Sequence, residues 1–181
     1  MIDLTKKGLP NVVEIGGNPY SIYTDFRKWL KFEISVSKMQ PEEHIDIKYL
    51  FKSHMPPYCN LSDLFVFSRP VSPLPRQIGA GSDAIVIDYE LDAELIYAAF
   101  LGQYGIDLTE VEELHWHKFL ALLKGLNEST RLREVMGYRC YEKRDKDSNV
   151  DVYEQLRLAW EIERIAPVQQ EDIDRFNNYF D

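Results

Sequence analysis

The chain has 181 residues, 45% hydrophobic and 28% charged, so it can bury a globular core and is not an intrinsically disordered sequence. Acidic residues outnumber basic ones by 30 to 21, and the net charge of −9 argues against nucleic acid or an anionic membrane as a partner of the whole molecule. The sequence contains neither a signal peptide nor an apolar run of the roughly 18 residues that a membrane span needs, which predicts a soluble protein that stays where it is made.

Residues 11–23 predict a β-hairpin. Apolar residues on both sides flank the segment Gly16-Gly17-Asn18, whose residues tolerate the positive φ angles of a tight turn. Thr24 or Asp25 is then expected to cap a helix that extends to about Met39. Its predicted apolar face consists of residues at helical spacing: Phe26, Trp29, Leu30 and Ile34.

Two further helices are expected before the middle of the chain. Pro41 occupies the position that proline favours at a helix start, and a helix from there would end at Met55 and carry Ile45, Tyr49 and Leu50 on its face. A short helix is predicted from Asn60 or Ser62 to about Phe67.

Residues 68–83 predict a linker, because proline, glycine and serine fill half of this segment. A structureless loop of this length is unusual inside a compact domain. The linker divides the chain into an N-terminal part, 1–67, and a C-terminal part, 84–181, which we expect to form one compact unit together.

The C-terminal part predicts helices over about 89–104, 109–126, 127–139 and 148–165. Gly105 suits the end of the first helix, and Thr109 with Glu112 forms the pattern of a capping box for the second. The last helix should direct inward its apolar residues Val152, Leu156, Ala159 and Trp160. The expected fold is therefore mainly α, a helical domain of about five to seven helices with a small N-terminal β-hairpin.

Few residues are arranged for catalysis. Helical neighbours two positions apart point about 200° away from each other, so His115 and His117 cannot share one metal ion, and structural roles are expected for both. The acidic cluster Asp88, Glu90, Asp92 and Glu94 fits either a weak cation site or acids at a helix N-terminus, where the helix dipole favours them. We assign no catalytic, cofactor-binding or metal-binding residue and expect no enzyme and no cofactor; a metal-dependent enzyme that uses the acidic cluster is the less favoured alternative.

The two cysteines, Cys59 and Cys140, match neither a zinc-site spacing nor a Cys-x-x-Cys motif, and they are expected to be reduced thiols. Arg139 gives weak support for a lowered thiol pKa at Cys140. Gly79-Ala80-Gly81-Ser82 lacks the lysine of a phosphate-binding loop and is interpreted as linker.

Several aromatic and aliphatic residues are candidates for binding a partner protein, since tyrosine and tryptophan are enriched at interface hot spots. Most of the aromatic residues are expected in the core, and those of the C-terminal segment could dock on their own domain or on another chain. The candidates are Tyr97, Tyr104, Trp116, Ile173, Phe176 and Phe180.

Segments of the chain resemble a bacteriophage tail-morphogenesis family. The resemblance is most specific over Asp88–Leu108 and Leu114–Leu123, includes Tyr23–Trp29, and spans about residues 11–141. The family occurs in siphophages and prophages of Gram-positive hosts, and its genes lie next to that of the tape-measure protein.

The resemblance implies a tail assembly factor, in particular a tail assembly chaperone that binds the tape-measure protein before the tail tube polymerises. The implied partners are the tape-measure protein and other tail assembly proteins, with a homo-oligomer also possible, and the implied location is the cytoplasm of the bacterial host. The alternative is a structural tail or connector subunit that is retained in the virion.

Overall fold

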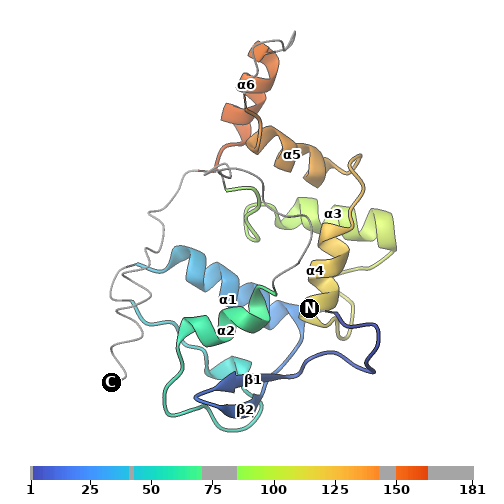
Figure 1. Ribbon diagram of the computed structural model, residues 1–181. Helices are drawn as coiled ribbons and strands as arrows, with labels where there is room; N and C mark the ends of the chain where they lie inside the picture. The colour runs from blue at the N-terminus through green and yellow to red at the C-terminus, as the bar shows by residue number, and fades with distance from the viewer. Residues whose placement is uncertain (1, 41–42, 71–84, 143–149, 163–181) are drawn as a thin grey trace. The chain divides into compact units, whose positions relative to one another are not determined.

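The computed structural model describes residues 2–40, 43–70, 85–142 and 150–162. Within these ranges the fold is mainly α with a small N-terminal β-hairpin, as predicted (Figure 1). The residues group into two compact units. The first contains the described residues up to 70 together with 112–121, and the second contains 85–111 together with 122–142 and 150–162.

The hairpin confirms the prediction from the Gly-Gly turn. Strands β1 (Val12–Ile15) and β2 (Asn18–Ser21) pair antiparallel, with Ile15 opposite Asn18. Gly16 and Gly17 connect them with φ angles of 56° and 75°, which only glycine adopts readily.

Helix α1 (Phe26–Lys38) begins where predicted, because the Asp25 carboxylate accepts the Arg27 backbone N–H at 3.0 Å. Its buried face differs from the predicted one. Phe26 and Trp29 are buried as expected, but Phe32 and Val36 complete the face, while Leu30 and Ile34 are only partly buried.

The helix predicted from Pro41 to Met55 is wrong over its described residues. Residues 43–47 are irregular, and only the short 3-10 helix η1 (Lys48–Leu50) forms. The next residues instead pair with the end of the hairpin: the Tyr23 N–H donates to Leu50 O at 2.8 Å and the Lys52 N–H to Ser21 O at 3.0 Å. Strand-like pairing to a distant segment therefore overrides the local helical pattern.

Helix α2 (Leu61–Ser68) confirms the short helix and includes Ser68, which the sequence assigned to the linker. Arg69 and Pro70 follow the helix without regular structure, and residues 71–83 of the predicted linker lie outside the described residues. Helix α2 packs against β1, and α1 packs against η1.

Helix α3 (Ala93–Tyr104) begins later than predicted because residues 89–92 form turns, and it ends at Gly105, whose φ of 65° confirms the predicted C-terminal glycine. Helix α4 (Trp116–Lys124) begins seven residues after Thr109, so the predicted capping box is wrong. Asp107 Oδ1 accepts both the N–H and the hydroxyl of Thr109, which holds a turn there.

The residues before α4 are held in an extended bridge with the segment before α1. Trp116 N donates to Thr24 O at 2.7 Å, and Phe26 N donates to Leu114 O at 2.8 Å. This pairing delays the start of α4 and brings residues 112–121 into the first unit.

Helix α5 (Arg131–Arg139) begins after Thr130, slightly later than the predicted caps Asn127 and Ser129. Helix α6 (Val150–Trp160) ends before Ile165. The prediction that its apolar residues point inward is wrong for Val152, which is 57% exposed, and for Ala159, which is also exposed; Leu156 and Trp160 are partly buried. In the part of the chain that the structure describes, no helix is long and apolar enough to cross a membrane.

Candidate functional site

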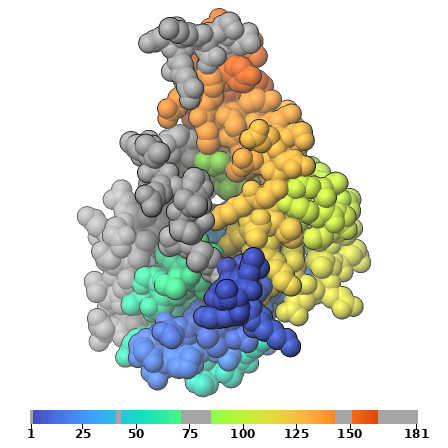
Figure 2. Space-filling model, turned by 45° about the vertical axis from the view of Figure 1, so that its right-hand side comes forward, coloured from blue at the N-terminus to red at the C-terminus, as the bar shows by residue number. Residues whose placement is uncertain are grey.

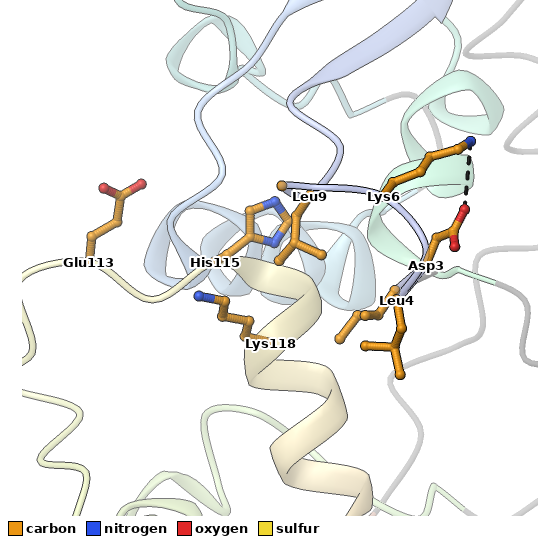
Figure 3. Close-up of a pocket in the computed structure, with 9 residues that line it drawn as sticks. Asp3, Leu4, Lys6, Leu9, Glu113, His115 and Lys118 are labelled. Carbon is orange, nitrogen blue, oxygen red and sulfur yellow. Dashed lines mark ion pairs between the residues drawn. The ribbon is translucent and has the colours of Figure 1, made fainter.

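A hollow of about 580 Å³ lies in the first unit between the N-terminal segment and the start of α4 (Figure 3). The N-terminal segment is at the molecular surface, where it is dark blue in Figure 2. It contributes Leu4, which is 94% exposed, and the ion pair between Lys6 and Asp3 at 3.6 Å. The opposite wall contains Glu113, His115 and Lys118.

His115 faces this hollow, but both of its ring nitrogens are occupied. Nδ1 accepts the His117 N–H at 3.0 Å, which leaves Nε2 to donate to Pro10 O at 2.9 Å. Burial lowers the pKa of His115, so the neutral ring is favoured. His115 therefore fastens the N-terminal segment to the start of α4.

His117 has a similar structural contact deeper in the first unit. Its Nε2 lies 2.8 Å from Phe67 O, its ring stacks on that of Phe67 with centroids 4.5 Å apart, and its buried Nδ1 has no hydrogen-bond partner in the described residues. Burial lowers the pKa of His117 to about 4. Both histidines thus bind backbone carbonyls, and the described residues contain no group of three or more His, Cys, Asp or Glu that could hold a metal ion.

Trp116, a candidate partner-binding residue, is 1% exposed. Its Nε1 donates to Ser68 O at 2.8 Å, and its ring stacks on Phe119 with centroids 5.5 Å apart. In this structure the side chain offers no surface to a partner, and its burial supports the core role that the sequence left open.

Tyr97 and Tyr104, on α3 of the second unit, are partly exposed. The Tyr97 hydroxyl donates to Asp107 Oδ2 at 3.1 Å, and the Tyr104 hydroxyl donates to Leu122 O at 2.8 Å. These bonds fix the rings while leaving part of each in contact with solvent. Ile173, Phe176 and Phe180, the remaining candidates, lie outside the described residues.

The acidic cluster before α3 does not act as a single group. Asp88 Oδ1 accepts the N–H groups of Glu90 and Leu91, both at 2.8 Å, and so stabilises the turn. Asp92 is 1% exposed and forms a two-pronged ion pair with Arg139, at 2.6 Å and 2.9 Å. Asp92 is therefore already engaged by a cation from the chain itself.

Arg139 has a structural role that the sequence did not indicate. Its guanidinium also donates to Trp160 O at 2.8 Å and to Val86 O at 3.2 Å, so it connects the ends of α5 and α6 with the start of α3. The expected effect on Cys140 is wrong: partial burial raises the thiol pKa, despite the nearby charges of Arg133 and Arg139. Both cysteines are free thiols.

The second unit exposes several large aliphatic side chains. Leu91 is 70% exposed, Leu101 43%, Val152 57% and Leu158 58%. Helix α6 contributes no fully buried side chain among those described. Such side chains mark a surface that can bind another polypeptide where they form a contiguous patch.

Comparison with known proteins gives one family. The sequence model of the family described as Bacteriophage Gp15 protein matches residues 5–162. No curated protein matches the chain. No solved structure matches it either.

Proposed function

We propose a function for this chain from its family: it belongs to the bacteriophage Gp15 protein family, and we infer that it is a tail assembly factor. In this role it acts as a chaperone that binds the phage tape-measure protein in the host cytoplasm before the tail tube polymerises. The observation that carries the proposal is the family match, which extends over residues 5–162.

The physical need for such a factor follows from the partner. A tape-measure protein is a long helical chain, and its apolar stripes are exposed to water until tube subunits surround them. A chaperone must cover these stripes and yet be displaced by the polymerising tube. Many moderate contacts satisfy both requirements better than one very tight interface.

The second unit offers contacts of this type. Leu91 and Leu101 adjoin or belong to α3, Val152 and Leu158 belong to α6, and all four are substantially exposed. We infer that a partner helix contacts these side chains, together with the partly exposed Tyr97 and Tyr104 of α3. The net charge of −9 disfavours association with the phage DNA.

The experiment is co-expression with the tape-measure protein of the same phage. We expect the chain to raise the soluble yield of the tape-measure protein several-fold and to co-purify with it. Val152→Ser/Leu158→Ser should reduce both effects, because it removes two exposed apolar contacts of the second unit.

Val12→Ser/Val66→Ser is the matched control, since these side chains are 42% and 78% exposed in the first unit. It should leave both yield and co-purification unchanged. A tape-measure protein that is equally soluble without the chain contradicts the chaperone role. Equal losses in the two double variants contradict the assignment to the second unit.

A further inference from the structure

Three lysines and two tyrosines form a cationic patch on the first unit, which we name the lysine–tyrosine patch: Tyr23, Lys28, Lys31, Tyr49 and Lys52. The Lys28 ammonium lies 4.4 Å from the ring centroid of Tyr23 and 6.0 Å from that of Tyr49. Lys31 lies 4.5 Å from Tyr49, and Lys52 lies 5.8 Å from Tyr23. Ring faces attract cations, so the tyrosines hold the ammonium groups together on one surface.

The backbone beneath the patch is fixed by pairing between distant segments. Tyr23 N donates to Leu50 O at 2.8 Å and Lys52 N donates to Ser21 O at 3.0 Å, on either side of the bridge between Ile22 and Phe51. Lys28 and Lys31 are three residues apart on α1 and so lie on the same side of that helix. The arrangement therefore exists before any ligand binds, which lowers the entropic cost of binding.

The ammonium groups of the patch remain available. Within the described ranges, none of the three forms an ion pair with a carboxylate, whereas the adjacent Arg27 pairs with Asp25 at 3.1 Å. Each ammonium has three N–H donors, and contact with a ring face leaves donors available for hydrogen bonds to a carboxylate. Unpaired cations gathered at one place are notable on a protein whose net charge is −9.

We propose that the lysine–tyrosine patch binds a short acidic segment of a partner protein, whose carboxylates accept hydrogen bonds from the three ammonium groups. Such binding would not require the tail-assembly role proposed above.

The surroundings of the patch favour a short acidic peptide over nucleic acid. Asp25, Glu112 and Glu113 line the same hollow of about 450 Å³ as Lys28 and Lys52. Duplex DNA carries a charge every ~1.7 Å along its axis and would bring phosphates against these carboxylates. A short peptide can place its carboxylates near the lysines alone. The negative charges of the protein that lie more than a Debye length away, about 8 Å at physiological salt, are largely screened.

The test measures fluorescence anisotropy of a fluorescein-labelled peptide of alternating glutamate and glycine, titrated with the full chain at low salt. We expect saturable binding that weakens as salt is raised. Lys31→Gln/Lys52→Gln should weaken it about tenfold, because two exposed charged contacts are lost. Lys31→Arg/Lys52→Arg keeps the charges and should stay within about threefold of the original affinity.

Lys7→Gln/Lys124→Gln is the matched control, since it removes the same charge from exposed lysines outside the patch. We expect it to weaken binding by less than about twofold. Equal weakening by the two glutamine variants, or no binding by the unmodified chain, overturns the proposal.

Two further probes identify other occupants. A single-stranded oligonucleotide of equal charge that binds the patch as tightly as the peptide would make it a general anion site, which contradicts the proposal.

The segment near the C-terminus contains Glu171, Asp172 and Asp174. If Glu171→Gln/Asp172→Asn/Asp174→Asn tightens peptide binding about tenfold, the occupant is this segment of the chain itself and the proposed partner is wrong; we expect no change.

Discussion

The interior of the first unit contains a cluster of packed aromatic rings among its aliphatic side chains, whereas the interior of the second contains an ion pair. In the first unit Phe26 stacks on Phe119 with centroids 5.0 Å apart, and Trp29 lies 4.5 Å from Phe67. In the second, Asp92 and Arg139 are 1% and 5% exposed. We therefore expect the stability of the first unit to depend on the packing of its side chains and on the neutral state of His117. The stability of the second unit should depend on the ion pair between Asp92 and Arg139.

The largest expected effect comes from breaking that pairing. Arg139→Ala leaves the Asp92 carboxylate buried without its cation, and loss of one partner of a buried pair costs about 3–5 kcal/mol. Chemical denaturation of the full chain should show this loss. Arg131→Ala, which breaks the exposed pair with Glu134, should cost less than about 1 kcal/mol.

Replacing both members of the buried pair sharpens the comparison. Asp92→Leu/Arg139→Met removes both charges together and should recover much of the stability lost in Arg139→Ala. If Arg139→Ala costs no more than Arg131→Ala, the buried pair does not stabilise the second unit.

The second effect is a pH dependence of the first unit. The folded pKa of His117, about 4, lies below the unfolded value of 6.5, so the unfolded chain binds more protons between these pH values. The contribution of neutral His117 to the free energy of unfolding is therefore fully present above pH ~6.5. It falls as the pH drops toward ~4, by at most about 1.4 kcal/mol per pH unit.

Denaturation at several pH values, compared with His117→Gln, isolates this contribution. Glutamine can still donate to Phe67 O but does not titrate, so the variant should depend less steeply on pH across this window. Identical slopes for the two proteins would show that His117 is not held neutral.

The smallest effects concern two glycines, Gly102 inside α3 and Gly105 at the C-terminal end of this helix. Gly105 has a φ of 65°, and an added Cβ would meet no atom within 4 Å, so Gly105→Ala should cost about 1–2 kcal/mol from backbone strain alone. Gly102 lies inside the helix with equally open space, so Gly102→Ala should stabilise by about 0.5–1 kcal/mol. Thermal melting checks both, and a stabilising Gly105→Ala would contradict the left-handed cap.

Local patterns in the sequence predicted those elements that depend on local chemistry. The hairpin follows from Gly16-Gly17, the start of α1 from Asp25, and the end of α3 from Gly105. The predictions failed where a distant segment supplies the partner. Residues 50–52 and 114–116 pair with the segment that leads into α1, and no local periodicity reveals such pairing.

The same limit applies to the sites. The acidic residues before α3 were visible in the sequence, but Arg139, the partner of Asp92, lies 47 positions away and carries no local signal. The lysine–tyrosine patch also joins separate segments, since Lys28 and Lys31 come from α1 and Lys52 from the residues after η1. In contrast, membership of a bacteriophage protein family was recognisable from the sequence, because the similarity extends through most of the chain.

The most direct test of the tail-assembly role is quantitative mass spectrometry of the chain along the assembly path, in affinity-purified tape-measure complexes from infected cells and in purified virions. The chaperone role predicts that the chain is abundant in the complexes and absent from finished particles. Its presence in virions at a fixed copy number, or its absence from the tape-measure complexes, would contradict that role.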